Sequence, residues 1–350
     1  MNYSFALLLY LVGSSIPIYP QQHLSADVQF VSNTSIFPQG TFAACHASTI
    51  VEVAPGVMMA AWFAGSYEGA NDVGIWISSF QDNQWSNPVE IVTGKDSVGT
   101  RQACWNPVLF KSKKNTLFLF YKVGLNPREW RGMVVQSFDN GDHWTHPQEL
   151  PKGFLGPIKN KPIQLSNGDI LCPSSVESID AKNWTVHLEI TNEKLSSWKK
   201  VFIESDSTVG VIQPSIITHP DGKLQMLCRS RQNEIYNTWS ADNGVHWSAV
   251  QPLSLPNPNS GIDEVSLADG SFMLVYNPLT QGNDWYFGRN VLRVAVSLNG
   301  EDWKDICQLE NEKEGEFSYP AIIQAADNTI HITYTAQRQN IKHVILRLIE

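Results

Sequence analysis

The sequence predicts an all-β protein, a six-bladed β-propeller, because one unit of two strands and a turn recurs along it. An apolar strand, a tight polar turn and a second apolar strand return six times at a period near 50 residues. The second residue of each turn is Gly or Asn, which supplies the positive φ that a two-residue hairpin needs. One hairpin per repeat predicts one blade per repeat. The turns are Pro55-Gly56, Lys114-Asn115, Asn167-Gly168, Asp221-Gly222, Asp269-Gly270 and Asp327-Asn328.

A second repeated marker follows the hairpins and has the pattern S-x-D-x-G-x-x-W. Residues 137–144 and 240–247 match it in full, and degenerate copies end at Trp85, Trp198 and Trp303. Ser and Asp side chains bond the backbone of a turn, Gly allows a left-handed residue, and Trp packs on the blade. We expect these turns to join the third and fourth strands of a blade, on the face opposite the site. Their carboxylates are therefore expected to be structural.

The sixth repeat lacks this marker and needs a strand from elsewhere. We expect its C-terminal strands, 319–348, to pair with the N-terminal segment 28–42, which would close the ring and remove an open sheet edge. Residues 22–350 are thus predicted to form a single propeller domain. Residues 1–15 contain a short apolar run followed by small residues, which is typical of a signal peptide and predicts a secreted or periplasmic protein.

The composition excludes several classes of function. The net charge of −9 and the lack of a basic stripe argue against a nucleic-acid partner, so an anion-binding site must be a local cationic pocket. No stretch after the signal peptide is long and apolar enough to cross a membrane. None of the five cysteines has metal-ligand spacing, and neither a metal nor a cofactor is expected. A disulfide between Cys45 and Cys104 is conceivable but not favoured.

Several segments resemble a known family over the whole chain after the signal peptide. Besides the two S-x-D-x-G-x-x-W turns, they are CHASTIVEV at 45–53, RQACWNPVLF at 101–110, GPIKNKPIQL at 156–165, IQPSIITHPDGKLQMLCRSR at 212–231 and FSYPAIIQ at 317–324. The chain resembles the sialidase (neuraminidase) superfamily, in its group of sialidase-like BNR or Asp-box repeat proteins. The resemblance implies a six-bladed propeller of the sialidase type and an exo-glycosidase that releases a terminal carboxylate-bearing sugar. The Asp-boxes themselves indicate the fold and not the activity.

Strand direction predicts which side chains share the site face. An innermost strand begins on this face, and the loop between the second and third strands lies on it as well. The innermost strands contribute His46, Asn106, Lys161, Gln213, Asp263 and Tyr319. The loops contribute Glu68, Asp72, Lys122, Arg128, Ser175, Glu177, Arg229, Arg231 and the segment 277–289. These residues predict a polar funnel of mixed charge at the propeller axis.

The resemblance assigns roles to some of these residues. Arg229 and Arg289 match two of the three arginines with which sialidases bind the sugar carboxylate, and guanidinium forks suit that ligand. Tyr319 matches the nucleophilic tyrosine, and Asp72 or Glu68 lies where the acid/base loop belongs. The other residues expected to contact substrate are Arg231, Arg101, Lys161, Asn106, Gln213 and Asp263.

Two departures from the family pattern leave the reaction open. His46 stands where the family has its first arginine, and Gln213 stands where it has the glutamate that takes the tyrosine proton, which an amide cannot do. The missing cation could be Arg101, Lys159 or Lys161, and the missing base could be Glu177, Asp263 or Glu316.

Three functions therefore remain in contention for a monomer that binds an acidic oligosaccharide or glycoconjugate. The first is the exo-glycosidase. The second is a polysaccharide lyase in which His46 and Tyr319 move protons beside a uronic acid while Arg229 and Arg289 neutralise its carboxylate. The third is a propeller that binds carbohydrate without catalysis.

Overall fold

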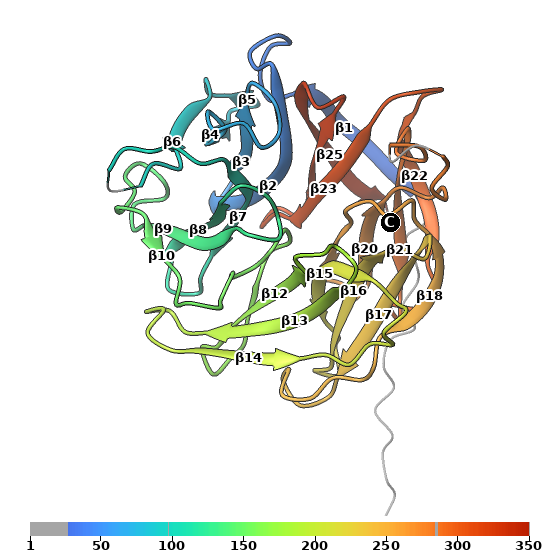
Figure 1. The fold of residues 1–350 in the computed structure, drawn as a ribbon. Coiled ribbons are helices and arrows are strands. Elements are labelled where there is room, and N and C mark those ends of the chain that lie inside the picture. Colours follow the sequence, from blue (N-terminus) through green and yellow to red (C-terminus); the bar gives the residue numbers. More distant parts are fainter. Residues whose placement is uncertain (1–26, 97, 284–285, 350) are drawn as a thin grey trace, which may run out of the picture.

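The computed structural model describes residues 27–96, 98–283 and 286–349, so the expected signal peptide lies outside the described residues. Every helix or strand in this described part is a β-strand, and the strands form six sheets around one axis (Figure 1). The prediction of an all-β, six-bladed propeller is confirmed. No helix in the described ranges is long and apolar enough to cross a membrane.

The first three blades run outward from the axis in chain order. Blade one contains β2 (Ala44–Ala54), β3 (Val57–Gly65), β4 (Gly74–Gln81), β5 (Gln84–Trp85) and β6 (Val89–Val92). Blade two contains β7 (Cys104–Lys111), β8 (Leu117–Val123), β9 (Arg131–Ser137) and β10 (Gln148–Glu149). Blade three contains β11 (Ile163–Gln164), β12 (Ile170–Glu177), β13 (Trp184–Thr191) and β14 (Trp198–Phe202).

The last three blades complete the ring. Blade four contains β15 (Val211–Thr218), β16 (Leu224–Ser230), β17 (Glu234–Ser240) and β18 (Gln251–Pro256). Blade five contains β19 (Asp263–Ser266), β20 (Phe272–Tyr276), β21 (Val291–Ser297) and β22 (Lys304–Asn311). Blade six contains β23 (Phe317–Gln324), β24 (Ile330–Ala336), β25 (Asn340–Ile349) and the N-terminal β1 (Asp27–Ser35).

Blade six is the place where the two ends of the described chain meet. Strand β1 pairs antiparallel with β25, from Asp27 opposite Ile349 to Ser35 opposite Lys342. Figure 1 shows the blue β1 beside the red strands of this blade. The outer edge of β25 is thereby covered, which removes a set of unpaired backbone groups.

The predicted hairpin turns have the backbone that their residues require. Each turn joins the first and second strands of its blade, and its second residue has a positive φ. The φ angles are 75° at Gly56, 64° at Asn115, 95° at Gly168, 86° at Gly222, 85° at Gly270 and 65° at Asn328. These turns all lie at the ends of the innermost strands that are remote from the site residues.

The two full Asp-boxes are local hydrogen-bonded turns. In the first, the Ser137 hydroxyl accepts the Gly141 amide at 2.8 Å and the Asp139 carboxylate accepts the His143 amide at 2.9 Å. That amide and the His143 ring hold the pKa of Asp139 at about 2. Ser137 pairs with Leu117, which follows the first hairpin turn of blade two. The box therefore lies on the same face of the propeller as the hairpin turns. The carboxylate therefore serves the turn, as the sequence predicts.

Four innermost strands carry a β-bulge at their beginning, and this bulge builds the site. The residues at φ between 39° and 56° are Ala47, Asn106, Gln213 and Tyr319, at matching positions of β2, β7, β15 and β23. In three of the four strands the next residue is proline, which has no N–H for the ladder and suits a bulge. A bulge re-aims the side chain at that point.

The bulge corrects one sequence alignment. We expected His46 to be equivalent to Asn106, Gln213 and Tyr319, but Ala47 occupies that position. His46 precedes the left-handed residue and corresponds to Trp105 in the next blade. Its ring is buried and packs against the rings of Phe63 and Tyr319.

Candidate active site

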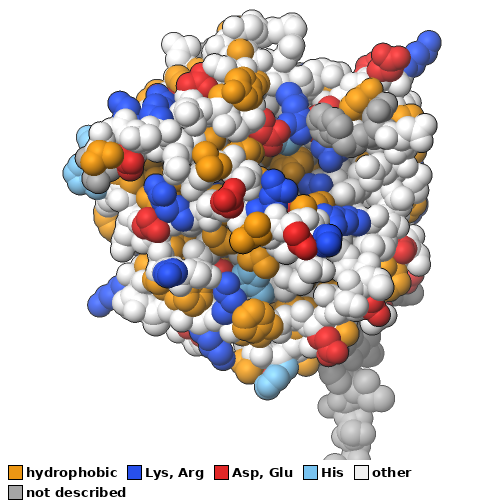
Figure 2. Space-filling view, in the orientation of Figure 1, with side chains coloured by type: hydrophobic (Ala, Val, Ile, Leu, Met, Phe, Trp, Pro, Cys, Tyr) orange, Lys and Arg blue, Asp and Glu red, His pale blue; other side chains and the backbone are white. Residues whose placement is uncertain are grey.

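Three arginines from three consecutive blades converge near the axis. Arg229 is in β16, Arg289 lies in the loop between β20 and β21, and Arg338 lies in the loop between β24 and β25. All three loops or strand ends are on the face where the innermost strands begin. Figure 2 shows acidic and basic side chains intermingled around the middle of the face in view.

Arg229 is buried and is held by neutral acceptors. Its Nη1 donates to the Tyr319 hydroxyl at 2.8 Å and to the Gln213 Oε1 at 3.1 Å, and its Nε donates to the Asn259 Oδ1 at 2.9 Å. The guanidinium also lies 5.8 Å from the Trp184 ring and 5.7 Å from the Tyr319 ring. The hydrogen-bond acceptors of this arginine in the described structure are therefore all uncharged.

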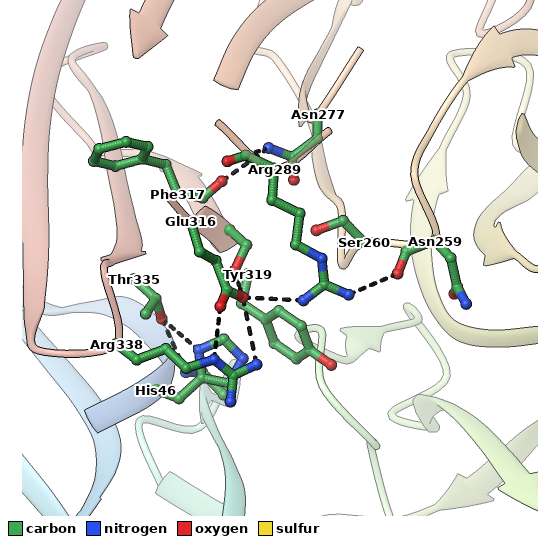
Figure 3. Close-up of polar contacts among 12 residues, drawn as sticks. His46, Asn259, Ser260, Asn277, Arg289, Glu316, Phe317, Tyr319, Thr335 and Arg338 are labelled. Atoms are coloured by element: carbon green, nitrogen blue, oxygen red, sulfur yellow. Dashed lines mark hydrogen bonds and ion pairs between the residues drawn. The ribbon is translucent and has the colours of Figure 1, made fainter. Parts of the chain in front are cut away.

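Arg289 and Arg338 share one buried carboxylate, that of Glu316 (Figure 3). Arg289 donates to Glu316 Oε1 at 3.0 Å, and Arg338 donates to Glu316 Oε2 at 2.7 Å. Burial would raise the pKa of Glu316, but the guanidinium groups of Arg338 and Arg289 outweigh it and hold the pKa at about 2. Burial and the nearby charge of Arg229 lower the pKa of Arg289. The positive charges of Arg229 and Arg289, held this close together, favour the binding of an anion between them.

Tyr319 brings its hydroxyl to these arginines from a strained backbone. Its φ is 53°, a left-handed value that is uncommon for a bulky residue and is found most often at functional sites. Gly261 leaves room for the ring, because a Cβ there would lie 3.3 Å from it. The ring is half-buried and packs 4.2 Å from the His46 ring, centre to centre.

The Tyr319 oxygen receives hydrogen bonds from two donors. Arg229 has only donors to offer, so the Gln213 Oε1 must face Arg229 and the Gln213 Nε2 must face Tyr319, at 3.2 Å. The hydroxyl proton consequently points away from both neighbours. Gln213 thus orients the tyrosine and cannot remove its proton.

His46 is a buried neutral group and does not supply the missing charge. Burial, followed by the charge of Arg338, lowers its pKa well below the usual value. Its Nδ1 lies 3.0 Å from the Thr335 hydroxyl, which already accepts the Ala47 amide at 3.2 Å. The cation on this side of the site is Arg338.

The two acidic residues of the β3–β4 loop have different surroundings. Glu68 forms an ion pair with Arg338 and lines, with His46 and Phe63, a cavity of about 330 Å³. Asp72 instead accepts the amide and hydroxyl of Ser66 inside its own loop, and the Ser66 hydroxyl in particular lowers its pKa. Glu68 is therefore the carboxylate that this loop places beside the arginines.

Glu177 is a further carboxyl group near Arg229, at the end of β12. Burial raises its pKa, although Arg229, Arg231 and Arg128 act in the opposite direction. It lines a separate cavity of about 340 Å³ together with Arg128 and Trp130. A carboxyl group with a raised pKa keeps its proton to a higher pH than an exposed glutamate does.

Several residues expected to contact substrate form ion pairs and hydrogen bonds within the protein, with partners from other blades or from nearby loops. Lys161 and Asp263 pair with each other at 2.8 Å, and Asp263 also accepts the Ser215 hydroxyl and the Ile322 amide. Arg101 donates to the carbonyls of Asn71 and Asp72 and pairs with Glu90.

The other residues expected to contact substrate also form contacts within the protein. Arg231 stacks 3.9 Å above the Trp184 ring and donates to the carbonyls of Ala181 and Lys182. Asn106 donates to the Ile158 carbonyl at 3.2 Å. Lys159 is buried under Tyr319, donates to the carbonyls of Ile262 and Pro320, and has its pKa lowered by burial to about 7.

Two residues of the site were not predicted. Arg338 lies in the second-to-third-strand loop of blade six, so the rule that selected Arg229 would have found it had it been applied to the last repeat. Asn259 lies in the connection between blades four and five, which no rule singled out. In the sequence it is one asparagine in an N-P-N-S-G turn.

The shared carboxylate predicts an acid-sensitive part of the stability. Because the pKa of Glu316 falls from its usual value near 4.5 to about 2, its contribution is complete above pH 4.5 and is lost as the pH falls toward 2. We expect Glu316→Gln to lower the Tm at pH 6, and the difference from the unmodified protein to shrink between pH 4.5 and 2. Thermal unfolding across this range measures it, with the exposed Glu312→Gln as control. A difference that stays constant with pH contradicts the assignment.

The five cysteines are all free thiols, so the disulfide between Cys45 and Cys104 is not formed. Among the described residues, no group of three or more His, Cys, Asp or Glu side chains is arranged to hold a metal ion.

Comparison with solved structures returns other propellers of this kind. A protein of unknown function from Dyadobacter fermentans is 17% identical, with a TM-score of 0.75 over 92% of this chain and 99% of that chain. The intramolecular trans-sialidase from Ruminococcus gnavus, in complex with oseltamivir carboxylate, is 14% identical, with a TM-score of 0.69 over 90% and 98%. The α-L-arabinanase from Penicillium chrysogenum, complexed with arabinobiose, is 17% identical, with a TM-score of 0.67 over 91% and 99%.

At these identities the likeness shows a shared fold. A search of curated proteins finds no match. The family model described as the BNR repeat-like domain matches residues 56–332, which is most of the chain and runs from the first hairpin turn to the second strand of blade six. Together with the two Asp-boxes and the sialidase-type propeller, this match shows that the chain belongs to the BNR repeat-like, sialidase-like family.

Proposed function

We propose that this protein is an exo-glycosidase that releases a terminal carboxylate-bearing sugar. The observation that carries the proposal is the convergence of Arg229, Arg289 and Arg338 near Tyr319, whose hydroxyl Arg229 contacts. Guanidinium groups from three blades can surround one carboxylate with charge-assisted hydrogen bonds. They would fix the sugar with its anomeric carbon close to the tyrosine.

In this scheme Tyr319 is the reacting residue. Its hydroxyl loses the proton to solvent, and the oxygen, stabilised as an anion by Arg229, bonds to the anomeric carbon while the glycosidic bond breaks. Glu68 takes up a proton from solvent in place of its ion pair with Arg338 and gives that proton to the leaving oxygen. Water then releases the sugar and returns a proton to Glu68.

A polysaccharide lyase is the second candidate, and two observations favour it. The groups that contact the Tyr319 oxygen are donors, and a neutral His46 packs against the ring where a sialidase-like site would have an arginine. In a lyase the arginines would neutralise the carboxylate of a uronic acid, His46 would take the proton from the neighbouring carbon, and the glycosidic bond would break as Tyr319 gives a proton to the leaving oxygen.

One experiment separates the candidates. The purified protein is incubated with a panel of acidic oligosaccharides, and both released monosaccharide and ultraviolet absorbance are followed. The exo-glycosidase releases a terminal acidic sugar without new absorbance, whereas a lyase forms an absorbing unsaturated product. Binding of acidic glycans without either product would instead identify a carbohydrate-binding propeller.

Gln213 predicts that the native substrate is not an ordinary sialoside. Replacing it with glutamate gives Arg229 a charged partner and removes the amide donor from Tyr319. We therefore expect Gln213→Glu to leave sialoside cleavage weak and to lower the native reaction about tenfold. Assays of a simple sialoside and of the best panel substrate measure both effects. Robust cleavage of the sialoside by the unmodified protein, or a gain of it in the variant, would refute this prediction.

A further inference from the structure

Asn259 touches two of the three arginines at once. Its side-chain Oδ1 accepts Nε of Arg229 at 2.9 Å, and its backbone carbonyl accepts Nη2 of Arg289 at 3.0 Å. Figure 3 shows the second of these bonds, with Asn259 facing the Arg289 guanidinium. One residue thus fixes how far apart the two cationic groups lie.

The turn that holds Asn259 is itself rigid. Asn259 has a φ of 55°, and asparagine adopts left-handed backbone more readily than most residues. The buried Asn257 side chain accepts the Ser260 amide at 2.8 Å, and the Asn257 backbone N–H donates to the Asn233 carbonyl at 3.0 Å. On the Arg289 side, Gly288 approaches Pro258 so closely that a Cβ would lie only 2.7 Å from the proline.

That the Asn259 side-chain amide is uncharged matters as much as its position. The hydrogen-bond acceptors of Arg229 in the described structure are Asn259, Gln213 and Tyr319, and all of them are uncharged. Arg289 and Arg338, in contrast, share the Glu316 carboxylate. A neutral acceptor orients Arg229 and leaves its charge for a ligand.

We propose that Asn259 is a positioning residue that sets the spacing of Arg229 and Arg289 and, through its neutral amide, reserves the charge of Arg229 for the substrate carboxylate. This inference rests on the proposed carboxylate-binding function. It differs from a purely structural role, because aspartate would accept the same hydrogen bond and would preserve the turn.

The test compares two substitutions at this residue with a matched control. Asn259→Asp keeps the acceptor and adds a negative charge, whereas Asn259→Gly keeps the carbonyl and the left-handed backbone and removes the side-chain acceptor. Asn328→Asp adds the same charge at a residue with a φ of 65° in a hairpin turn remote from the site. Isothermal titration measures the binding of N-acetylneuraminate and D-glucuronate, with D-glucose as the uncharged probe.

We expect Asn259→Asp to lower the affinity for at least one of the acids at least tenfold and Asn259→Gly to lower it about fivefold, with Asn328→Asp unchanged. In turnover assays, KM should rise more than kcat falls. If the unmodified protein binds the acid and Asn259→Asp binds it equally well, the inference about Asn259 is overturned and the proposed function is not. Lack of acid binding by the unmodified protein overturns the proposed function together with it. If Asn259→Asp does not fold, unchanged binding by Asn259→Gly overturns the inference.

Discussion

Tyr319→Phe is expected to lower turnover about 10³-fold and to leave the fold intact. The substitution removes only the hydroxyl, while the ring that packs against His46 and over Gly261 remains. The hydroxyl is the one group that Arg229 and Gln213 both orient, and a positioned group that reacts or moves a proton commonly contributes 10²–10⁴-fold. Initial rates on the best acidic substrate, with Tm measured in parallel, test this expectation.

Tyr334→Phe is the matched control in the same blade. Tyr334 is buried in β24 and donates to Glu310 at 2.6 Å, so its loss should reduce stability by about 1 kcal/mol without a comparable loss of turnover. If Tyr319→Phe retains full activity, Tyr319 is a packing residue and the chemistry lies elsewhere.

Arg289→Ala is expected to weaken binding of an acidic ligand by about 10- to 150-fold. Loss of one charge-assisted contact costs about 1.5–3 kcal/mol. It also leaves Glu316 with one cationic partner fewer, which makes the pocket more negative. Arg229→Ala should have an effect of the same size, because it removes the guanidinium that retains its charge beside the Tyr319 hydroxyl.

Arg293→Ala provides the control, because Arg293 lies only four residues further on and pairs with Asp305 on the outer strands of the same blade. Its loss should change ligand affinity less than twofold. Titration of the same acid against all three variants gives the comparison. Equal affinity in Arg289→Ala, Arg229→Ala and the unmodified protein would end the carboxylate-site proposal.

The fold could be predicted because its signals are local. A Gly or Asn in a two-residue turn and a Ser, Asp, Gly and Trp within one box each act on their immediate neighbours. Their recurrence gives the number of blades without any knowledge of contacts between blades.

The site was predicted only in part because its contacts cross between blades. Arg229, Gln213 and Tyr319 lie at strand positions that the repeat identifies, and the structure brings them together. The spacing of the strands does not reveal which side chains pair with partners elsewhere in the chain. Lys161, Asp263 and Arg101 have such partners, and strand spacing alone could not show whether they face a ligand. His46 was aligned one residue away from its true position because a β-bulge changes the register of β2. The proline that follows the bulged residue in the other three strands is absent here, so the sequence does not reveal this bulge.

The closure of blade six by β1 has a consequence for how the protein is made. Glu316, Tyr319 and Arg338 all belong to this blade, whose four strands come from both ends of the described chain. During synthesis β1 emerges first and has no partner until β25 has been translated. Blades one to five can form earlier, but the arginine cluster and the tyrosine cannot be assembled before the ring closes. Catalytic competence is therefore expected to appear only after blade six has formed.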